Sequence, residues 1–227
     1  HGTATTSIIA ARRDAKDIPS NMQGVAYDSK ILFIATELGD PPADGDYVPT
    51  TIQKYDWSSY DQAEANLYNE LSSKVDIINN SFGFTGQITD YPKEIFESNF
   101  PKFINSLEEN KETIFVWSAG NYNGITDTNG EKVDAADPGW LAGLSYYFPE
   151  LADNNIAVVA VDREGTIADW SNRCGVVKDT CIAAPGSRIN VAIPNNLYVS
   201  LTERERNGLN EDVLEYLKNH PTEAYLL

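Results

Sequence analysis

The sequence has few basic residues and no long apolar run. Seventeen lysines and arginines stand against 34 aspartates and glutamates in 227 residues, which gives a formal net charge of −17. Such a surface repels phosphate backbones and anionic lipid headgroups, so we expect no binding to nucleic acid. No apolar stretch approaches the roughly 18 residues of a membrane-spanning helix, so we expect no direct membrane insertion of this segment.

Nucleotide-binding loops and a leader segment are also missing. No GxGxxG or Walker pattern occurs, which argues against a Rossmann-like nucleotide-binding domain. The chain begins at His1 without an initiator methionine. We therefore expect the true N-terminus to lie elsewhere, and the lack of a signal peptide carries no weight.

Only two cysteines are present, Cys174 and Cys181, seven residues apart. That spacing fits no common zinc or redox motif, because those motifs pair cysteines about two to four residues apart. The residues alone leave a short disulfide loop or two unrelated buried thiols open. A loop this short would stabilise the fold by roughly 2–3 kcal/mol and would persist only in an oxidising compartment.

Short apolar segments rich in β-branched residues alternate with helical patterns. The predicted strands are Lys30–Ala35, Val75–Ile78, Thr113–Trp117, Ile156–Val161 and, more weakly, Thr180–Ala184. The predicted helices are Gly2–Arg13, Ser59–Ser73 and Lys93–Glu109, which Pro101 is expected to break or kink. Near-continuous apolar strands between helices predict an α/β fold with a mostly parallel sheet.

Three polar stretches lie outside this pattern. Gly39–Thr51 and Tyr122–Gly139 are rich in glycine, proline and aspartate and are predicted surface loops. The second contains five acidic or amide side chains and could hold calcium, but their spacing matches no EF-hand, so we assign no metal or cofactor. Leu201–Leu217 is charged and helical in pattern, and residues 195–227 are interpreted as an insertion or appended helical segment.

Two predicted strands end in segments that suit a binding site. Val75–Ile78 is followed by Asn79–Gly83, and Thr113–Trp117 is followed by Ser118–Asn121. Open parallel sheets place their sites at the carboxyl ends of strands, and the glycine in each turn lets backbone approach a ligand. Taken alone, each turn is also how many ordinary α/β strands end.

The order of these segments resembles the subtilisin-like serine protease family (subtilases). The matching segments, which span about residues 1–193, are His1-Gly2-Thr3 with its small-residue helix, Gly24-Val25-Ala26, Ser81-Phe82-Gly83, Ser118-Ala119-Gly120-Asn121 and Ala184-Pro185-Gly186. The resemblance implies a three-layer α/β fold whose mostly parallel central sheet is flanked by helices. Residues 1–227 would then be a partial catalytic domain.

A second segment resembles one particular type of subtilase. Trp170–Gly175, followed by Cys181 and Ala184-Pro185-Gly186, is similar to subtilases of the bacterial autotransporter type. This similarity implies that Cys174 and Cys181 form a disulfide. It also implies export through the periplasm, with the protein secreted or displayed at the cell surface.

The resemblance assigns roles to individual residues. His1 would be the general base, and Asn121 would donate a hydrogen bond to the oxyanion of the tetrahedral intermediate. Ser81, Phe82 and Gly83 match the strand edge that pairs with a polypeptide substrate. Ser118, Ala119 and Gly120 match the other wall of the primary specificity pocket, where small side chains leave room for a sizeable apolar residue.

The sequence departs from the family pattern at two places. The family's aspartate precedes its histidine, and nothing precedes His1. No Gly-Thr-Ser or Gly-x-Ser-x-Gly occurs, and Ser187 and Ser200 lack the small-residue helix that should follow the nucleophile. We interpret the chain as truncated at both ends, so that the piece alone would be inactive. The alternative is a non-catalytic pseudoprotease that acts as a peptide-binding module.

Overall fold

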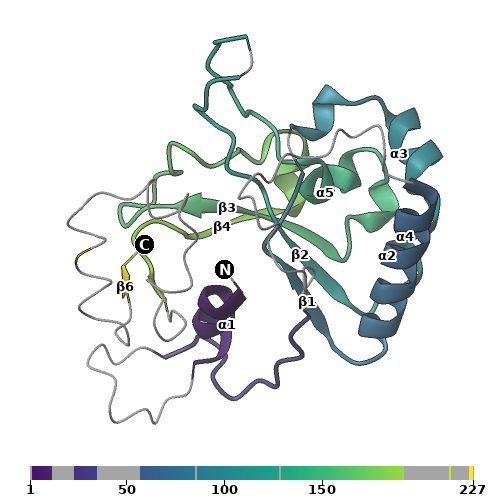
Figure 1. Cartoon of the computed structure of the whole chain (residues 1–227), viewed down its shortest axis with the longest axis horizontal. Coiled ribbons are helices and arrows are strands. Elements are labelled where there is room, and N and C mark those ends of the chain that lie inside the picture. Colours follow the sequence, from purple (N-terminus) through teal and green to yellow (C-terminus); the bar gives the residue numbers. More distant parts are fainter. Residues whose placement is uncertain are drawn as a thin grey trace. The chain divides into compact units, whose positions relative to one another are not determined.

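The structure is a computed structural model, which describes residues 2–11, 23–34, 57–84, 86–127 and 129–191 together with Glu215 and Tyr225–Leu226 (Figure 1). The chain divides into two compact units. One comprises His1–Ile52 and Arg188–Leu227, and the other is Gln53–Ser187. Each unit is described by itself.

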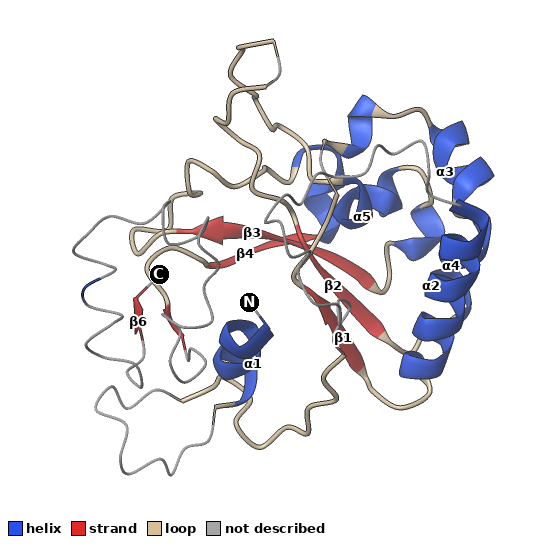
Figure 2. Ribbon diagram, in the orientation of Figure 1, coloured by secondary structure: helices blue, strands red, loops and turns tan. Residues whose placement is uncertain are grey.

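The sheet of unit Gln53–Ser187 has four parallel strands in the order β1-β2-β3-β4 (Figure 2). Their bounds are β1 Ile77–Asn80, β2 Ile114–Ser118, β3 Asn155–Val161 and β4 Cys181–Pro185. Four of the five predicted strands are therefore confirmed within one to two residues at most ends, as is the parallel arrangement.

Helices connect these strands. They are α2 Trp57–Ser72, α3 Lys93–Asn99, α4 Pro101–Glu109 and α5 Trp140–Gly143, with short 3₁₀ turns at Ile88–Asp90, Leu144–Tyr146, Pro149–Leu151 and Gly175–Thr180. The break predicted at Pro101 is confirmed: Phe100 has a non-helical φ of −131°, and Pro101 is the first residue of α4. Proline suits that position because the first turn of a helix needs no N–H from it.

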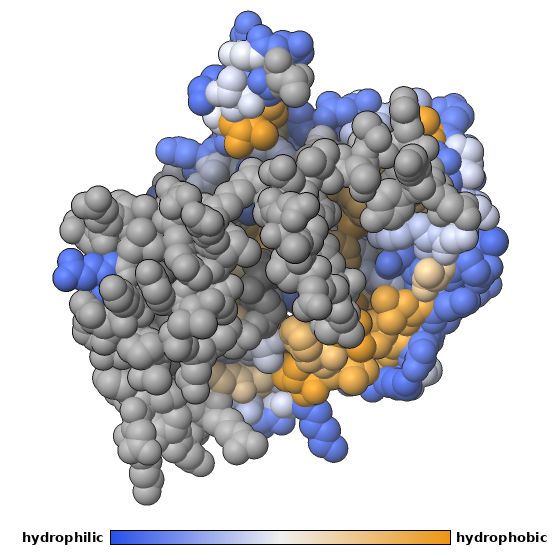
Figure 3. Space-filling model, in the orientation of Figure 1, coloured by the Kyte–Doolittle hydropathy of each residue, from blue (hydrophilic) through white to orange (hydrophobic). Residues whose placement is uncertain are grey.

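One face of the sheet is packed and the other is partly open within this unit. Phe115 and Trp117 of β2 are buried in an aromatic core with Phe96, Phe103 and Trp140 from the helices. On the opposite face, a set of isoleucines is 39–59% exposed: Ile77, Ile114 and Ile182. Figure 3 shows apolar side chains gathered near β1 and β2.

The other unit contains α1 Gly2–Ala10 and a short antiparallel pair, β5 Asn190–Val191 with β6 Tyr225–Leu226. Backbone N–H groups of Gly24, Val25 and Ala26 donate to carbonyls at the end of α1, at distances of 2.7–3.0 Å. These bonds satisfy carbonyls that a helix end leaves without partners. A Cβ on Gly24 would lie 2.4–2.6 Å from the backbone of this helix, so the close approach needs glycine.

The strand predicted at Lys30–Ala35 is wrong for the residues described. Residues 30–34 form a loop, and the side chains of Ile31, Leu32, Phe33 and Ile34 are 41–58% exposed. An apolar run becomes a strand only when another strand satisfies its backbone groups, and the described residues offer no such partner. Ala35, the predicted loop Gly39–Thr51 and all of Leu201–Leu217 except Glu215 lie outside the described residues.

The loop predicted at Tyr122–Gly139 is confirmed as irregular structure over its described residues. An isolated bridge joins Thr126 to Lys132 within it, and another pairs its last residue, Gly139, with Gln87. The Asp127 carboxylate accepts the N–H groups of Asn129 and Glu131, both at 2.9 Å. These hydrogen bonds hold the pKa of Asp127 below its ordinary value. This acidic side chain therefore shapes the tip of the loop.

Candidate active site

The carboxyl ends of β1 and β2 lie side by side. The two strands are neighbours, with Asn80 opposite Trp117, so the segments that follow them leave the same edge of the sheet. The Ser118 hydroxyl donates to the carbonyl of Phe82 at 3.3 Å and links the two segments directly. The fold thus places the start of Ser118–Asn121 beside the segment that follows β1, while the roles predicted for these residues stay predictions.

Buried contacts fix the end of β1. The Asn80 side chain is buried and accepts a hydrogen bond from the Tyr68 hydroxyl of α2 at 2.8 Å. Burial, aided by the charge of Glu64, raises the pKa of Tyr68 well above its ordinary value, so this hydroxyl stays protonated and donates. On the other side of the strand, the Asn79 amide donates to the Ser81 hydroxyl at 2.8 Å.

Phe82 is partly exposed and rests on the core. Its ring meets the Trp117 ring edge-on, with 6.4 Å between centroids, and Trp117 itself is buried and donates to Asn155. Phe82 also lines a cavity of about 10 Å³, whose other walls are Tyr60, Glu64, Tyr68, Phe103, Trp140 and Leu141. A cavity of that size holds about one water molecule. Core packing therefore accounts for the aromatic character of this region.

The turn after β2 is tied down on both sides. The Ala119 N–H donates to the Val158 carbonyl of β3 at 2.9 Å, and the Ala119 carbonyl accepts from Gly139 at 2.7 Å. Gly120 has a φ of +114°, in the region that favours glycine. A Cβ there would meet the side-chain amide of Asn172 at 3.1 Å. Ala119 and Gly120 are thus fixed by backbone geometry as well as by their small size.

Asn121 lies at the exposed tip of this turn. Within the described part of the chain, no hydrogen bond engages its side-chain amide, while the Tyr122 N–H donates to the Asn172 side chain and the Gly120 carbonyl accepts the Asn172 N–H. Its carboxamide is therefore available to a ligand. Ser81, Gly83 and Ser118 are likewise partly or fully exposed, and Ala119 is buried.

His1 lies outside the described residues, so its role as general base stays a prediction. The helix predicted to follow it is present as α1.

Among the described residues, no group of three or more His, Cys, Asp or Glu side chains could hold a metal ion. None of the described helices is both long and apolar enough to cross a bilayer.

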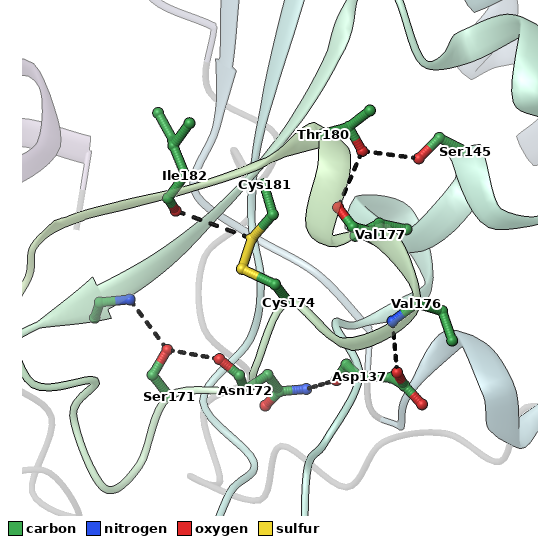
Figure 4. Close-up of a disulfide and its surroundings, with 11 residues drawn as sticks. Asp137, Ser145, Ser171, Asn172, Cys174, Val176, Val177, Thr180, Cys181 and Ile182 are labelled. Carbon is green, nitrogen blue, oxygen red and sulfur yellow. Dashed lines mark hydrogen bonds between the residues drawn. A yellow bond between two sulfur atoms is a disulfide. The ribbon is translucent and has the colours of Figure 1, made fainter.

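Cys174 and Cys181 are joined in a disulfide, with 5.8 Å between their Cα atoms (Figure 4). The alternative of two unrelated thiols is therefore wrong. The bond closes the turn between the loop that contains Asn172 and strand β4.

Sequence reasoning missed two residues that shape the site. Asn172 belongs to the Trp170–Gly175 motif and Asp137 to the acidic loop Tyr122–Gly139, but the sequence predicted no role for either side chain. In the structure Asn172 is hydrogen-bonded to the turn that presents Asn121, and the Asp137 carbonyl accepts a hydrogen bond from the Asn172 side chain. Nothing in the spacing signals this, because the contacts span 35 and 50 residues of sequence.

The sequence model of the Subtilase family (Peptidase S8) matches residues 1–214, which is most of the chain. The chain belongs to the subtilase family. This membership, the parallel sheet and its helices confirm the α/β fold class predicted from the sequence.

Curated relatives of this subtilase chain are much longer than it is. It is 35% identical to the serotype-specific antigen 1 of Mannheimia haemolytica over 138 residues, which covers 60% of the chain and 14% of the relative. It is 25% identical to an extracellular serine protease of Serratia marcescens over 229 aligned positions, covering 83% of the chain and 18% of the relative. The chain thus spans less than a fifth of these relatives.

Solved structures of two maturation proteases share the subtilase fold. The prenylagaramide maturation protease PagA aligns with a TM-score of 0.52 at 22% identity, over 86% of this chain and 55% of that one. The patellamide maturation protease PatA aligns with a TM-score of 0.50 at 19% identity, over 96% and 71%. At these identities the likeness concerns the fold alone.

Proposed function

We propose that the protein is a serine endopeptidase in which His1 is the general base and Asn121 donates to the oxyanion. The aspartate and the serine of an Asp-His-Ser triad would come from sequence outside these 227 residues. The serine oxygen would bond to the substrate carbonyl carbon while its proton passes to His1. The peptide C–N bond would then break, and His1 would give that proton to the leaving amine. Water would release the acyl group by the same steps.

One observation carries this proposal. In a chain that matches the Subtilase family over residues 1–214, the turn after β2 carries the exposed Asn121, whose side-chain amide is engaged by no hydrogen bond among the described residues. Ser118, at the start of this turn, is hydrogen-bonded to Phe82. A preorganised donor at such a position stabilises the charge that develops in the transition state. The amide is fixed to a turn whose backbone is hydrogen-bonded to β3, so little reorganisation accompanies the reaction.

The same edge suits a polypeptide substrate. Gly83 is exposed, and apart from its chain neighbours no atom of the described residues lies within 4 Å of the position of a Cβ on it, so backbone can approach it closely. We propose that an extended peptide pairs with Ser81–Gly83 through main-chain hydrogen bonds, which are largely indifferent to its side chains. Ser118, Ala119 and Gly120 would form the facing wall of the pocket for the residue before the cleaved bond.

We also propose that the protein is exported through the periplasm, as autotransporter-type subtilases are, and is secreted or displayed at the cell surface. The disulfide between Cys174 and Cys181 supports an oxidising compartment. The names of two relatives, an extracellular serine protease and a serotype-specific antigen, also support a secreted or surface location.

A fluorophosphonate probe, which labels activated serines, tests the proposed activity in the full gene product. We expect the wild-type protein to be labelled and to cleave an unstructured protein substrate. His1→Ala should abolish both. His220→Ala, which changes the other histidine of these 227 residues, should alter neither. A folded wild-type protein that binds peptides but resists labelling would contradict the proposal and favour a peptide-binding module.

A further inference from the structure

We infer that Asn172 is a positioning residue: it fixes the turn that carries Asn121 and thereby aims the oxyanion-binding amide. The inference rests on the proposed endopeptidase function. Asn172 lies 50 residues after Tyr122 in the sequence and is fully buried. None of its side-chain atoms is available to a substrate, so it can act only through its neighbours.

Asn172 contacts the residues on both sides of Asn121. Its side-chain oxygen accepts the N–H of Tyr122 at 2.8 Å, and its backbone N–H donates to the carbonyl of Gly120 at 2.9 Å. The turn is thereby fixed immediately before and immediately after Asn121. A displacement of Asn121 would have to lengthen at least one of these bonds.

The fit between Asn172 and the turn is close. Three atoms of the Asn172 side-chain amide lie 3.1 Å from where a Cβ on Gly120 would stand. The positive φ of Gly120 lets the backbone pass over the amide at this distance. Glycine and asparagine therefore form a matched pair, and a change in either shifts the turn.

Asn172 is itself hydrogen-bonded to two further segments of the chain (Figure 4). Its side-chain N–H donates to the carbonyl of Asp137 at 3.0 Å. The Ser171 hydroxyl donates to the Asn172 carbonyl at 3.0 Å and accepts the N–H of Ala160, a residue of β3, at 3.1 Å. The Asp137 carboxylate in turn accepts the N–H of Val176, inside the disulfide loop, at 2.9 Å.

These contacts specify an amide at position 172. The side chain must accept from Tyr122 and donate to Asp137 at the same time. Aspartate offers the acceptor without the donor, and alanine offers neither. A looser turn would change where the Asn121 amide points. Because the oxyanion forms only during the reaction, the loss should fall on kcat and leave KM almost unchanged.

Kinetics of the full gene product test this inference. Asn121→Ala should lower kcat by about 10²–10³, a magnitude measured in a subtilisin of this family. Asn172→Ala should lower kcat by roughly 10–100-fold, with KM within about twofold of wild type. In the Asn121→Ala background, Asn172→Ala should cost little more, because both changes remove the same interaction.

Asn154→Ala is the matched control. Asn154 is also a buried asparagine, and its amide donates to the carbonyls of Leu107, Asn110 and Thr113, away from the Asn121 turn. It should lower stability without changing kcat. If Asn172→Ala does not fold, Asn172→Asp keeps the volume and the Tyr122 acceptor, and it should show the same split between kcat and KM with a smaller fall.

Hydrogen exchange gives a readout besides activity. In the Asn172→Ala protein, mass spectrometry should show exchange at the Tyr122 amide at least tenfold faster, and Asn154→Ala should leave it unchanged. A folded Asn172 variant with wild-type kcat, or a loss that adds fully to that of Asn121→Ala, would overturn the inference alone. An inactive wild-type protein would overturn the proposed function and the inference together.

Discussion

Buried side-chain amides provide much of the local order around the candidate active site. Asn80, Asn155 and Asn172 are each at most 5% exposed, and each pairs with a group from another element. An amide suits this task because it donates and accepts at once, so that one side chain can join two segments. Leaving one buried partner unpaired costs about 1–3 kcal/mol.

The contact between Gly120 and Asn172 makes a direct prediction. Gly120→Ala would place a Cβ 3.1 Å from the Asn172 amide at a φ of +114°. We expect a loss of about 1–3 kcal/mol in the free energy of unfolding, together with a fall in kcat. Gly130→Ala is the control, because Gly130 has a similar φ of +86°, but apart from its chain neighbours no atom of the described residues lies within 4 Å of a Cβ placed there. Urea denaturation measures both, and equal losses would contradict a specific role for Asn172.

Two glutamates of α2 predict opposite pH dependences. Burial raises the pKa of Glu64 above its ordinary value of 4.5, although a hydrogen bond from Tyr60 opposes the shift. The folded state then binds more protons than the unfolded state between the two pKa values, so stability falls as pH rises through that window. Glu64→Gln removes this penalty and should raise the melting temperature at pH 7, with a gain that vanishes as pH falls below 4.5.

Glu70→Gln should behave in the reverse way. A hydrogen bond from Lys74 lowers the pKa of Glu70 below 4.5, so its contribution to stability is present above that value and is lost as pH falls through the folded-state pKa. The substitution should lower the melting temperature slightly at pH 7, because the pair is exposed. Thermal melts of both variants and the wild type at pH 4 and 7 measure the direction of each change in melting temperature. A Glu64→Gln protein that is less stable than wild type at pH 7 would refute the prediction for Glu64.

At the residue scale, the sequence could identify Asn121 but not the group that fixes it. Asn121 lies in a short motif after an apolar strand, so pattern alone singles it out. The role of Asn172 depends on a contact between the segment after β3 and the turn after β2. The two contacting residues are 50 positions apart, so no local sequence pattern predicts this contact. His1 lies outside the described part of the chain, so its predicted role cannot be compared with the structure.

At the element scale, the four strands of the sheet could be predicted because short apolar runs rich in β-branched residues are typical of parallel strands. The run Lys30–Ala35 has the same composition and forms no strand over residues 30–34. Apolar composition reports a tendency to be buried, whereas a strand also needs a hydrogen-bonding partner at the right register. The sequence of one segment cannot supply that information about another.

The start of α4 depends on a contact between helices, which yields a further prediction. The carboxylate of Asp61 on α2 is buried and accepts the N–H groups of Lys102 and Phe103 at 3.2 and 2.8 Å. It thereby caps α4 from 41 residues away, beside the positive end of the helix dipole. Asp61→Ala leaves both N–H groups without a partner and should cost about 2–3 kcal/mol.

Asp153→Ala serves as the control, since Asp153 is exposed on a turn. Chemical denaturation should show a lower midpoint for Asp61→Ala and a change within about 0.5 kcal/mol for Asp153→Ala. An Asp61→Ala protein as stable as wild type would show that water replaces the carboxylate at the end of α4.

At the scale of the whole molecule, the disulfide between Cys174 and Cys181 bears on both the proposed export and the candidate active site. The disulfide needs an oxidising compartment to form and persist, which supports the export proposed above. The disulfide also joins the loop beside the Asn121 turn to β4 at the edge of the sheet. Its effect should therefore extend from global stability to the active site.

Removal of the disulfide separates these two effects. The double variant Cys174→Ser/Cys181→Ser should lose about 2–3 kcal/mol in the free energy of unfolding, because the unfolded chain regains the freedom of the short loop. Reduction of the wild-type protein with dithiothreitol should cause the same loss and should not affect the variant. Since Val176 in this loop donates to Asp137, which accepts the Asn172 amide, kcat should fall well below its wild-type value under conditions where the variant is still fully folded. A variant with reduced stability and unchanged kcat would contradict this prediction. The disulfide would then act on stability alone, and the hydrogen bond between Asn172 and Asp137 would hold the Asn121 turn without it.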